Sequence, residues 1–467
     1  MNNMKRSVRR VFWFLALCFF LLLGYLGKLA LVDRQEISTS SYNIRLRNDV
    51  EGIQRGDILD KDGEVLATSV QQEDGSYERS YERARMAAHL TGYSSVGKTG
   101  VEAAVNFQMM TPHMELVQRI LGLVMKQDPK GNDAVLTVDM DIQNVAGNLL
   151  GSAKGAIVVM EPSTGRVLAL QAYPDFNPNT VERDWDTLIS SEDTPLVNRA
   201  TQGIYPPGST FKMVTALAAM EYYPNWKEFT YHCQGEAVFE DKVIHCYKNR
   251  VHGTVDMKGA MAGSCNCYFA ALAKEIGADN LRKEMEKCGL MTDYGFDLTY
   301  TKSVMHLDKK SSESELVETA IGQGKTSVSP LYMAMLISAV ANEGIMMQPY
   351  CIDHMQYYNG KAGKTTVPKK LMEICTPEEA AELNEMLIGV VENGTGRAAQ
   401  IGGVTVAGKT GTAENATGKD HSWFVGYAPA ENPRVAVAVV IENAEAHGSA
   451  TPIAGKVLQA ALETMTE

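Results

Sequence analysis

The chain has no excess of basic residues, and this absence excludes one broad class of function. Its 467 residues include 44 Lys and Arg against 56 Asp and Glu, which gives a formal net charge of -12 at pH 7. Nucleic-acid binding depends on Lys and Arg that neutralise phosphates, so an acidic body is a poor candidate for it. With 45% apolar residues, the chain is long enough for a large core domain and a smaller second one.

A Cys-Xaa-Xaa-Cys pair is a familiar sign of a structural zinc site, and the eight cysteines include no such pair. His232-Cys233 and His245-Cys246 repeat at a spacing of thirteen residues, which suggests zinc. Without a compact ligand pair, the sequence favours neither a metal nor another cofactor. Cys233 and Cys246 are instead candidates for a disulfide outside the cell, or for free thiols in a reducing environment.

The first 32 residues have the pattern of a membrane anchor. Lys5, Arg6, Arg9 and Arg10 precede an apolar stretch from Val11 to Val32 that is long enough to cross a bilayer as a helix. Basic residues before such a helix predict a cytoplasmic tail at 1–10, a transmembrane signal anchor at 11–32 and an extracytoplasmic body. No small-residue cleavage pattern follows, which favours an uncleaved anchor over a removed signal peptide.

Three short segments fit together as one catalytic signature. They are Ser209-Thr210-Phe211-Lys212, Ser264-Cys265-Asn266 and Lys409-Thr410-Gly411-Thr412. This set, in this order, resembles the Ser-Xaa-Xaa-Lys, Ser-Xaa-Asn and Lys-Thr-Gly motifs of penicillin-binding proteins and their β-lactamase relatives. Each motif alone is weak, and Lys98-Thr99-Gly100 is a second Lys-Thr-Gly that we assign to structure. The joint order favours acyl transfer.

The residue types suit a serine nucleophile with a lysine base. Positions i and i+3 share a helix face, so Lys212 is expected beside the Ser209 hydroxyl if a helix begins at Ser209. Burial or a nearby cation such as Lys409 would lower the pKa of Lys212 enough for it to act as a base. Ser264 is a candidate proton relay, and the Asn266 amide offers both a donor and an acceptor to a substrate amide.

The Lys-Thr-Gly segment is expected to form an edge strand of the cleft. Gly411 would let a ligand approach the backbone closely. The ammonium group of Lys409 and the hydroxyls of Thr410 and Thr412 suit a substrate carboxylate.

The flanking sequence resembles a class B penicillin-binding protein from about Ala134 to the end of the chain. The matching segments are Val158–Pro162, Thr164–Ala169, Asn177–Asn179, Asn198–Ala200, Tyr205–Lys212, Gly322–Gly324, Gly408–Glu414 and Trp423–Tyr427. The resemblance implies a monofunctional D,D-transpeptidase that cross-links peptidoglycan stem peptides and is acylated by β-lactams. It assigns Ser209 as nucleophile, Lys212 as base and Ser264 as relay, with Asn266, Lys409, Thr410, Gly411 and Thr412 binding substrate. The backbone N–H groups of Ser209 and Thr412 would form the oxyanion hole.

The implied fold is α+β, the penicillin-recognition (serine β-lactamase-like) transpeptidase fold. We expect a strand at Ala134–Val138, a helix from about Asp139, a hairpin of 155–160 with 166–172, strands near 409–413, 422–428 and 434–442, and a closing helix from about Thr451. The middle of the domain, from about Ser209 to Asn393, is expected to be helical. The domain boundaries are 33–133 for a short pedestal and 134–467 for the transpeptidase domain. Within the pedestal, Arg55–Gly63 and Val65–Ala67 predict a strand, a turn and a second strand.

Two other classes stay open at this stage. A class D-like serine β-lactamase shares Ser-Thr-Phe-Lys and Lys-Thr-Gly, but Asn266, the anchor and the pedestal argue against it. A non-catalytic penicillin-binding scaffold or sensor is the other alternative, although only ten residues precede the membrane segment. The expected partners are D-Ala-D-Ala stem peptides with an amine acceptor, β-lactams and a membrane-embedded glycan polymerase of the wall-synthesis complex, without nucleic acid.

Overall fold

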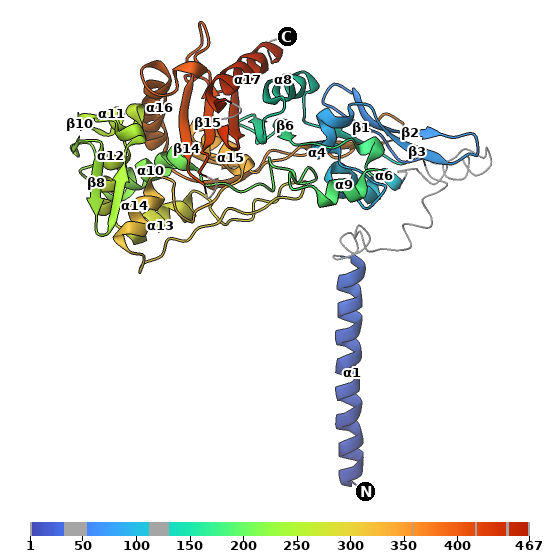
Figure 1. Cartoon of the computed structure of the whole chain (residues 1–467). Coiled ribbons are helices and arrows are strands. Elements are labelled where there is room, and N and C mark those ends of the chain that lie inside the picture. The colour runs from blue at the N-terminus through green and yellow to red at the C-terminus, as the bar shows by residue number, and fades with distance from the viewer. Residues whose placement is uncertain are drawn as a thin grey trace.

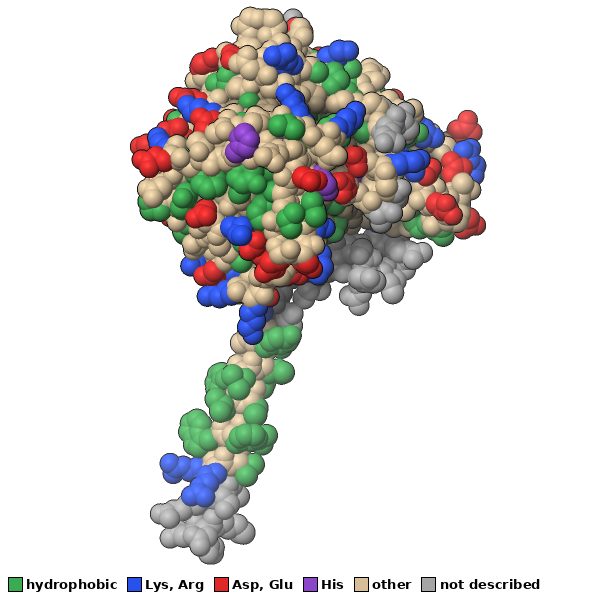
Figure 2. Space-filling view, turned by 60° about the vertical axis from the view of Figure 1, so that its left-hand side comes forward, with side chains coloured by type: hydrophobic (Ala, Val, Ile, Leu, Met, Phe, Trp, Pro, Cys, Tyr) green, Lys and Arg blue, Asp and Glu red, His purple; other side chains and the backbone are tan. Residues whose placement is uncertain are grey.

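The computed structural model describes residues 2–31, 54–111, 130–357, 359–415, 418–444 and 448–465. Helix α1 (Asn2–Leu31) stands apart from the folded body in Figure 1. Its segment Arg9–Lys28 has a mean hydropathy of 2.0 and is not buried against the body. By length and composition this helix can span a membrane, a test that a signal sequence also passes. Figure 2 shows hydrophobic side chains along it, whereas acidic and basic side chains are interspersed on the body.

A five-stranded sheet lies in the N-terminal part of the body (Figure 1), with the order β12-β4-β1-β2-β3. Its strands are β1 (Ile58–Leu59), β2 (Val65–Gln71), β3 (Tyr77–Tyr81), β4 (Asp133–Leu136) and β12 (Ile352–Gln356). The predicted strand, turn and strand are confirmed, since β1 and β2 are antiparallel and the Asp60 carboxylate accepts from the N–H groups of Asp62 and Glu64 in the turn.

The strand expected at Ala134–Val138 forms as β4, but its place differs from the expectation. We expected it to open the transpeptidase domain, whereas it pairs in parallel with β1 and antiparallel with β12 in the N-terminal sheet. The reason is that β1 and β12 flank it on both sides, a long-range pairing that local sequence does not encode.

The short helices beside this sheet are η1 (Ala84–Ala87), α4 (Ala88–Thr91), α5 (Gly100–Ala104) and α6 (Asn106–Met110). Glu102 on α5 is fully buried and binds Arg55 at 2.6 Å and Arg79 at 2.7 Å. Burial alone would raise the pKa of Glu102, but the two guanidinium groups lower it below its usual value. The second Lys-Thr-Gly lies here, with Thr99 directly before α5, so it belongs to this structural region.

The catalytic sheet is antiparallel, with the order β14-β15-β16-β5-β6. Its strands are β5 (Gly155–Met160), β6 (Val167–Tyr173), β14 (Ala407–Ala413), β15 (His421–Ala428) and β16 (Val435–Ile441), which confirms the predicted hairpin and C-terminal strands. Helices α8 (Met140–Leu150) and α17 (Ala450–Thr464) pack on one face, and α15 (Pro330–Ala341) packs on the other. β16 is buried along its whole length because both faces are covered.

The opposite side of the cleft is helical. It contains η3 (Gly208–Phe211), α10 (Lys212–Tyr222), α11 (Met257–Gly263), α12 (Asn266–Ile276), α13 (Ala278–Lys287), α14 (Glu313–Ala320) and α16 (Pro377–Glu392), with η4 (Tyr247–Asn249) in a loop. By contrast, η2 (Pro178–Thr180) and α9 (Trp185–Ser190) lie near the N-terminal sheet (Figure 1), and η5 (Arg397–Ala399) packs against α17. The expectation of a helical middle was incomplete. β12 lies within this region and belongs to the N-terminal sheet. Six further short strands interrupt the region, namely β7 (Tyr231–Cys233), β8 (Glu236–Phe239), β9 (Lys242–His245), β10 (Gly253–Val255), β11 (Ile345–Met347) and β13 (Lys370–Glu373). These six strands pair only in two-stranded ladders. Their sequences therefore lack the alternation of apolar and polar residues that predicts a half-buried strand.

Candidate active site

Ser209 lies on a tight turn that runs directly into a helix. The 3₁₀ turn η3 continues into α10, which begins at Lys212 rather than at Ser209, and this still places the two side chains one turn apart. Gly208 has a positive φ of 53°, and a Cβ there would lie 2.4 Å from the Thr412 carbonyl oxygen. Gly322 is equally constrained, because its Cβ would lie 1.9 Å from the Gly208 oxygen. Gly208 therefore lets the turn that carries Ser209 approach β14 closely, and Gly322 lets the segment after α14 approach that turn.

Lys212 is fully buried and stands at the centre of the site. Its Nζ lies 3.0 Å from Ser209 Oγ, 3.2 Å from Ser264 Oγ and 2.6 Å from the carbonyl oxygen of the Asn266 side chain. Burial lowers the pKa of Lys212 to about 8. A substantial fraction of this amine is therefore neutral near physiological pH and can accept the proton of Ser209.

Ser264 and Asn266 come from the junction of α11 and α12. Ser264 closes α11 in a left-handed conformation with φ 57° and ψ 43°, an uncommon backbone for a serine. Its Oγ lies between the two lysines, 3.2 Å from Lys212 Nζ and 3.0 Å from Lys409 Nζ. The Asn266 amide donates to the His245 carbonyl oxygen at 2.7 Å. Asn266 thus holds Lys212 and fastens α12 to the loop after β9, in addition to the substrate contact expected from the sequence.

Strand β14 provides the opposite wall. Lys409 is fully buried, and burial together with the charge of Lys212 holds its pKa well below the usual range. Thr410 Oγ1 lies 2.6 Å from Thr395 Oγ1, while the Thr412 side chain is exposed to the cleft. Trp423 on β15 is buried, and its indole N–H donates to the Pro206 carbonyl oxygen at 3.1 Å.

Gly411 also has a packing role, in addition to the ligand approach expected from the sequence. A Cβ at this position would lie 2.9 Å from Thr210 Cγ2 and 3.0 Å from Trp423 Cβ. These atoms belong to the protein rather than to the open cleft. Gly411 therefore lets β14 pack closely against the nucleophile turn.

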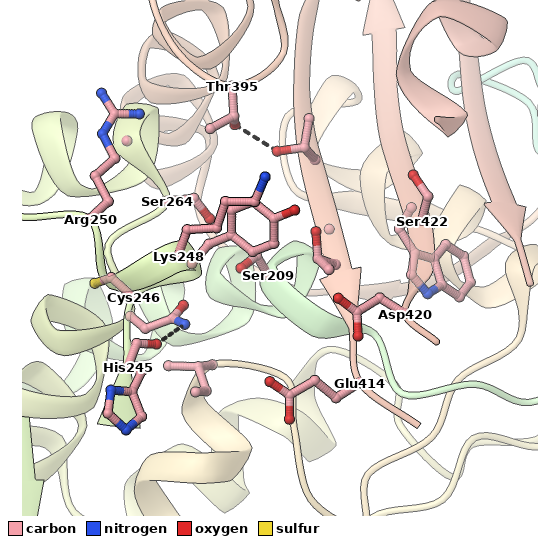
Figure 3. A pocket seen from close by; sticks show the side chains of 18 of the residues that line it. Ser209, His245, Cys246, Lys248, Arg250, Ser264, Thr395, Glu414, Asp420 and Ser422 are labelled. Carbon is pink, nitrogen blue, oxygen red and sulfur yellow. Dashed lines mark hydrogen bonds between the residues drawn. The ribbon is translucent and has the colours of Figure 1, made fainter. Parts of the chain in front are cut away.

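The motifs converge on a cavity of about 520 Å³ (Figure 3). Ser209, Ser264, Asn266, Thr410, Gly411 and Thr412 all line it. Its other walls include Lys248 and Arg250 on the loop after β9, and Glu414 and Asp420 beyond β14, which Figure 3 shows on opposite sides. No motif in the sequence predicted that these four side chains would line the cavity. The only sequence signal for the loop wall was the set of cysteines and histidines that flanks it.

This arrangement of a half-buried serine, a lysine with a lowered pKa, a second serine and a second buried lysine is that of a serine acyl-transfer enzyme. The sequence matches the family model of the penicillin-binding protein transpeptidase domain over residues 155–462. It matches the family model of the penicillin-binding protein A dimerisation domain over residues 55–134. The chain therefore belongs to the penicillin-binding protein transpeptidase family, and it is of the class B type.

Individual relatives agree with this assignment. Peptidoglycan D,D-transpeptidase MrdA from Acinetobacter baumannii is 33% identical over 78% of this chain and 60% of its own length. Peptidoglycan D,D-transpeptidase PbpA from Mycobacterium tuberculosis is 31% identical over 90% of this chain and 91% of its own. The imipenem acyl-enzyme structure of penicillin-binding protein A from M. tuberculosis superposes with a TM-score of 0.83 at 31% identity, covering 89% of this chain and 99% of that one. The predicted family, fold class and enzyme class, a serine-type D,D-transpeptidase, are confirmed.

Proposed function

We propose that the chain cross-links peptidoglycan stem peptides through an ester on Ser209. Ser209 Oγ attacks the carbonyl carbon of the penultimate D-Ala while its proton passes to Lys212 Nζ. The backbone N–H groups of Ser209 and Thr412 stabilise the oxyanion, since the Gly208 turn and Thr412 lie side by side. When the tetrahedral adduct collapses, the terminal D-Ala leaves as its amine takes a proton relayed by Ser264.

Deacylation reverses these roles. The amine of an acceptor stem attacks the ester carbonyl, its proton passes through Lys212 and Ser264 to Ser209 Oγ, and the new peptide bond forms. Lys409, Thr410 and Thr412 bind the carboxylate of the leaving D-Ala, and Asn266 binds the amide of the donor stem. A β-lactam acylates the same serine because its strained amide occupies the position of the D-Ala-D-Ala bond.

The apolar helix α1 agrees with single-pass attachment to a membrane, as in this family. We place residues 1–10 in the cytoplasm, residues 11–32 in the membrane and the body outside, where residues 33–133 form a pedestal under the transpeptidase domain 134–467. A membrane-embedded glycan polymerase of the wall-synthesis complex supplies the strands to be cross-linked.

One observation carries the proposal. Ser264 Oγ accepts a hydrogen bond from each of the two buried lysines, so Ser209, Lys212, Ser264 and Lys409 form one hydrogen-bonded chain of 3.0, 3.2 and 3.0 Å links. That chain connects the nucleophile to the strand that binds the carboxylate, which is the path that the proton of the leaving amine requires.

Intact-mass spectrometry of the full chain in detergent, incubated with a penicillin and followed in time beside Ser209→Ala, tests the proposal. The expected result is one adduct per chain that persists for many minutes and is absent from the variant. An adduct that vanishes while the drug is consumed would indicate a β-lactamase instead. No Ser209-dependent adduct would leave only a scaffold role.

A further inference from the structure

A cluster of sulfur and nitrogen atoms lies next to the Ser264-Cys265-Asn266 segment, and the proposed reaction uses none of them. The Sγ atoms of Cys233, Cys246 and Cys265 and a ring nitrogen of His252 all lie within 4.8 Å of one another. The three cysteines are buried, and His252 is half-buried. No disulfide forms among the described cysteines, and Cys233 and Cys246 have their sulfurs 3.7 Å apart.

The distances have the spacing of a tetrahedral metal site. Two sulfurs about 2.3 Å from a common zinc lie about 3.8 Å apart, and a sulfur and an imidazole nitrogen about 2.0 Å from that zinc lie about 3.5 Å apart. The Sγ atoms of Cys246 and Cys265 are 3.8 Å apart, and Cys233 Sγ is 3.5 Å from His252 Nδ1. We propose that Cys233, Cys246, His252 and Cys265 bind one structural Zn²⁺.

The surrounding hydrogen bonds suit these ligand roles. His252 turns Nδ1 toward the sulfurs, and its Nε2 lies 3.1 Å from the Gly263 carbonyl oxygen, which fixes the tautomer that a ligating imidazole needs. The Gly235 N–H donates to Cys233 Sγ and the Tyr268 N–H donates to Cys265 Sγ, both at 3.4 Å. N–H groups directed at sulfur stabilise thiolates, the form in which cysteine binds a metal.

The topology explains why the ligands meet without a compact sequence motif. The hairpin of β8 and β9 returns the chain from Cys233 to Cys246. β10 then pairs with β7 so that Gly253 lies opposite Cys233, which brings His252 alongside. Cys265 follows after α11, as the N-cap of α12. A set of three thiolates and one imidazole with no open position is typical of structural zinc.

The proposed site differs from the zinc site that the sequence suggested. His232 and His245, which suggested zinc in the sequence, are exposed, and neither belongs to the four-ligand group. The ligand histidine is His252. Cys267 is a near neighbour, with its Sγ 3.6 Å from Cys246 and 3.7 Å from the Ile244 carbonyl oxygen, but it lies outside the group.

The metal would hold one wall of the catalytic cleft, a consequence that rests on the proposed function. Cys265 stands between Ser264 and Asn266, and Cys246 follows His245, whose carbonyl oxygen accepts from the Asn266 amide. His252 holds Gly263, the residue before Ser264. Cys246 and His252 also line the cavity, which gives an ion a route to the site. Zinc would therefore fix the positions of the relay serine and of Asn266.

The first test is the metal content of the full chain, purified in detergent under reducing conditions without chelator. Elemental analysis is expected to give about one zinc per chain, and zinc-edge X-ray absorption about three sulfurs and one nitrogen around the ion. A chain that holds no zinc even after zinc is added, an ion with a shell of oxygen and nitrogen alone, or a Cys233–Cys246 disulfide in peptide mapping would overturn the proposal. This measurement does not depend on acylation, so it separates failure of the site from failure of the proposed function.

Variants then identify the ligands. Cys233→Ser and Cys246→Ser are expected to lower zinc per chain at least about tenfold. Cys267→Ser, beside the cluster, and Cys375→Ser, buried elsewhere, are the matched controls and are expected to keep the metal. Full zinc in Cys246→Ser, or its loss from Cys267→Ser, would contradict the assignment. If the ligand variants do not fold, the absorption spectrum of the wild-type chain still decides.

Discussion

The two walls of the catalytic cleft are held in place by different means. β14 is the edge strand of a five-stranded sheet, is hydrogen-bonded to β15 along its length, and packs against α16 and the nucleophile turn. The opposite wall, around Ser264 and the loop after β9, is supported by two-stranded ladders and by a cluster of cysteine and histidine side chains.

The difference shows that one site can combine a wall held by backbone pairing in a large sheet with a wall held by side-chain contacts. The backbone hydrogen bonds between β14 and β15 fix the position of Lys409, and these bonds do not depend on the side chains next to it in the sequence. Ser264, with its left-handed backbone, and the loop beside it do not belong to a larger sheet, so side-chain contacts must define their geometry. Lys212 lies between the two walls, with hydrogen bonds to Ser209, Ser264 and Asn266.

Removing the buried base between the two walls should have the largest effect. We expect Lys212→Met to keep the fold, because methionine fills the same buried space, and to slow penicillin acylation about 10²–10⁴-fold through loss of the base. Stopped-flow or mass-spectrometric acylation rates measure this. The exposed Lys283→Met is the control and should acylate at the wild-type rate. A Lys212→Met rate within a few-fold of wild type would refute the base assignment.

The pH dependence of acylation should be the next largest effect. Because burial lowers the pKa of Lys212 to about 8, the neutral base is lost as the pH falls through that value. The acylation rate at subsaturating penicillin should therefore be flat above about pH 8 and fall about tenfold per pH unit below it. Circular dichroism over the same range should show an intact fold. An acylation rate that stays constant from about pH 6 to about pH 9 would mean that Lys212 is not the titrating base.

A methyl group on the sheet wall should disturb the rigid side of the comparison. Gly411→Ala places a Cβ within 2.9 Å of Thr210 and 3.0 Å of Trp423, so the free energy of unfolding should fall by about 1–3 kcal/mol. Gly402→Ala has nothing within 4 Å of its Cβ and should change stability by less than about 0.5 kcal/mol. Denaturant unfolding of both variants checks this. Equal stabilities would show that β14 yields easily at Gly411.

The smallest effect should come from the hydroxyl pair at the edge of the cleft. Thr395 Oγ1 and Thr410 Oγ1 lie 2.6 Å apart, and Thr395→Val removes this hydrogen bond at nearly constant volume. The free energy of unfolding should fall by about 1 kcal/mol, while the acylation rate changes by only a few-fold. Thermal unfolding together with acylation kinetics measures both. A loss of acylation comparable to that of Lys212→Met would mean that Thr395 belongs to the catalytic chain itself.

The same contrast decides how much the sequence could predict. The hairpin of β5 and β6, the three C-terminal strands and the helices at Asp139 and Thr451 were predicted because they carry apolar runs and turn residues that local chemistry explains. The partner of β4 and the packing role of Gly411 depend on segments far away in the sequence, so no local pattern encodes them.

The loop wall was the least predictable part. Its strands are only three or four residues long and mostly exposed, and they resemble ordinary loop sequence. Its four candidate ligands occur singly, so the spacing rules that identify zinc sites do not apply to them. The candidate catalytic residues, in contrast, were all in recognisable motifs, and the structure brings these motifs together at one cavity.

Exchange of D-Ala on nascent peptidoglycan tests the central claim most directly. The full chain in detergent would be incubated with strands whose stems end in D-Ala-D-Ala and with isotope-labelled D-Ala as the amine, and the stems analysed by mass spectrometry. The account predicts that the label replaces the terminal D-Ala with the wild-type chain but not with Ser209→Ala. Stems that lose D-Ala by hydrolysis without taking up label, or that exchange equally with the variant, would contradict it.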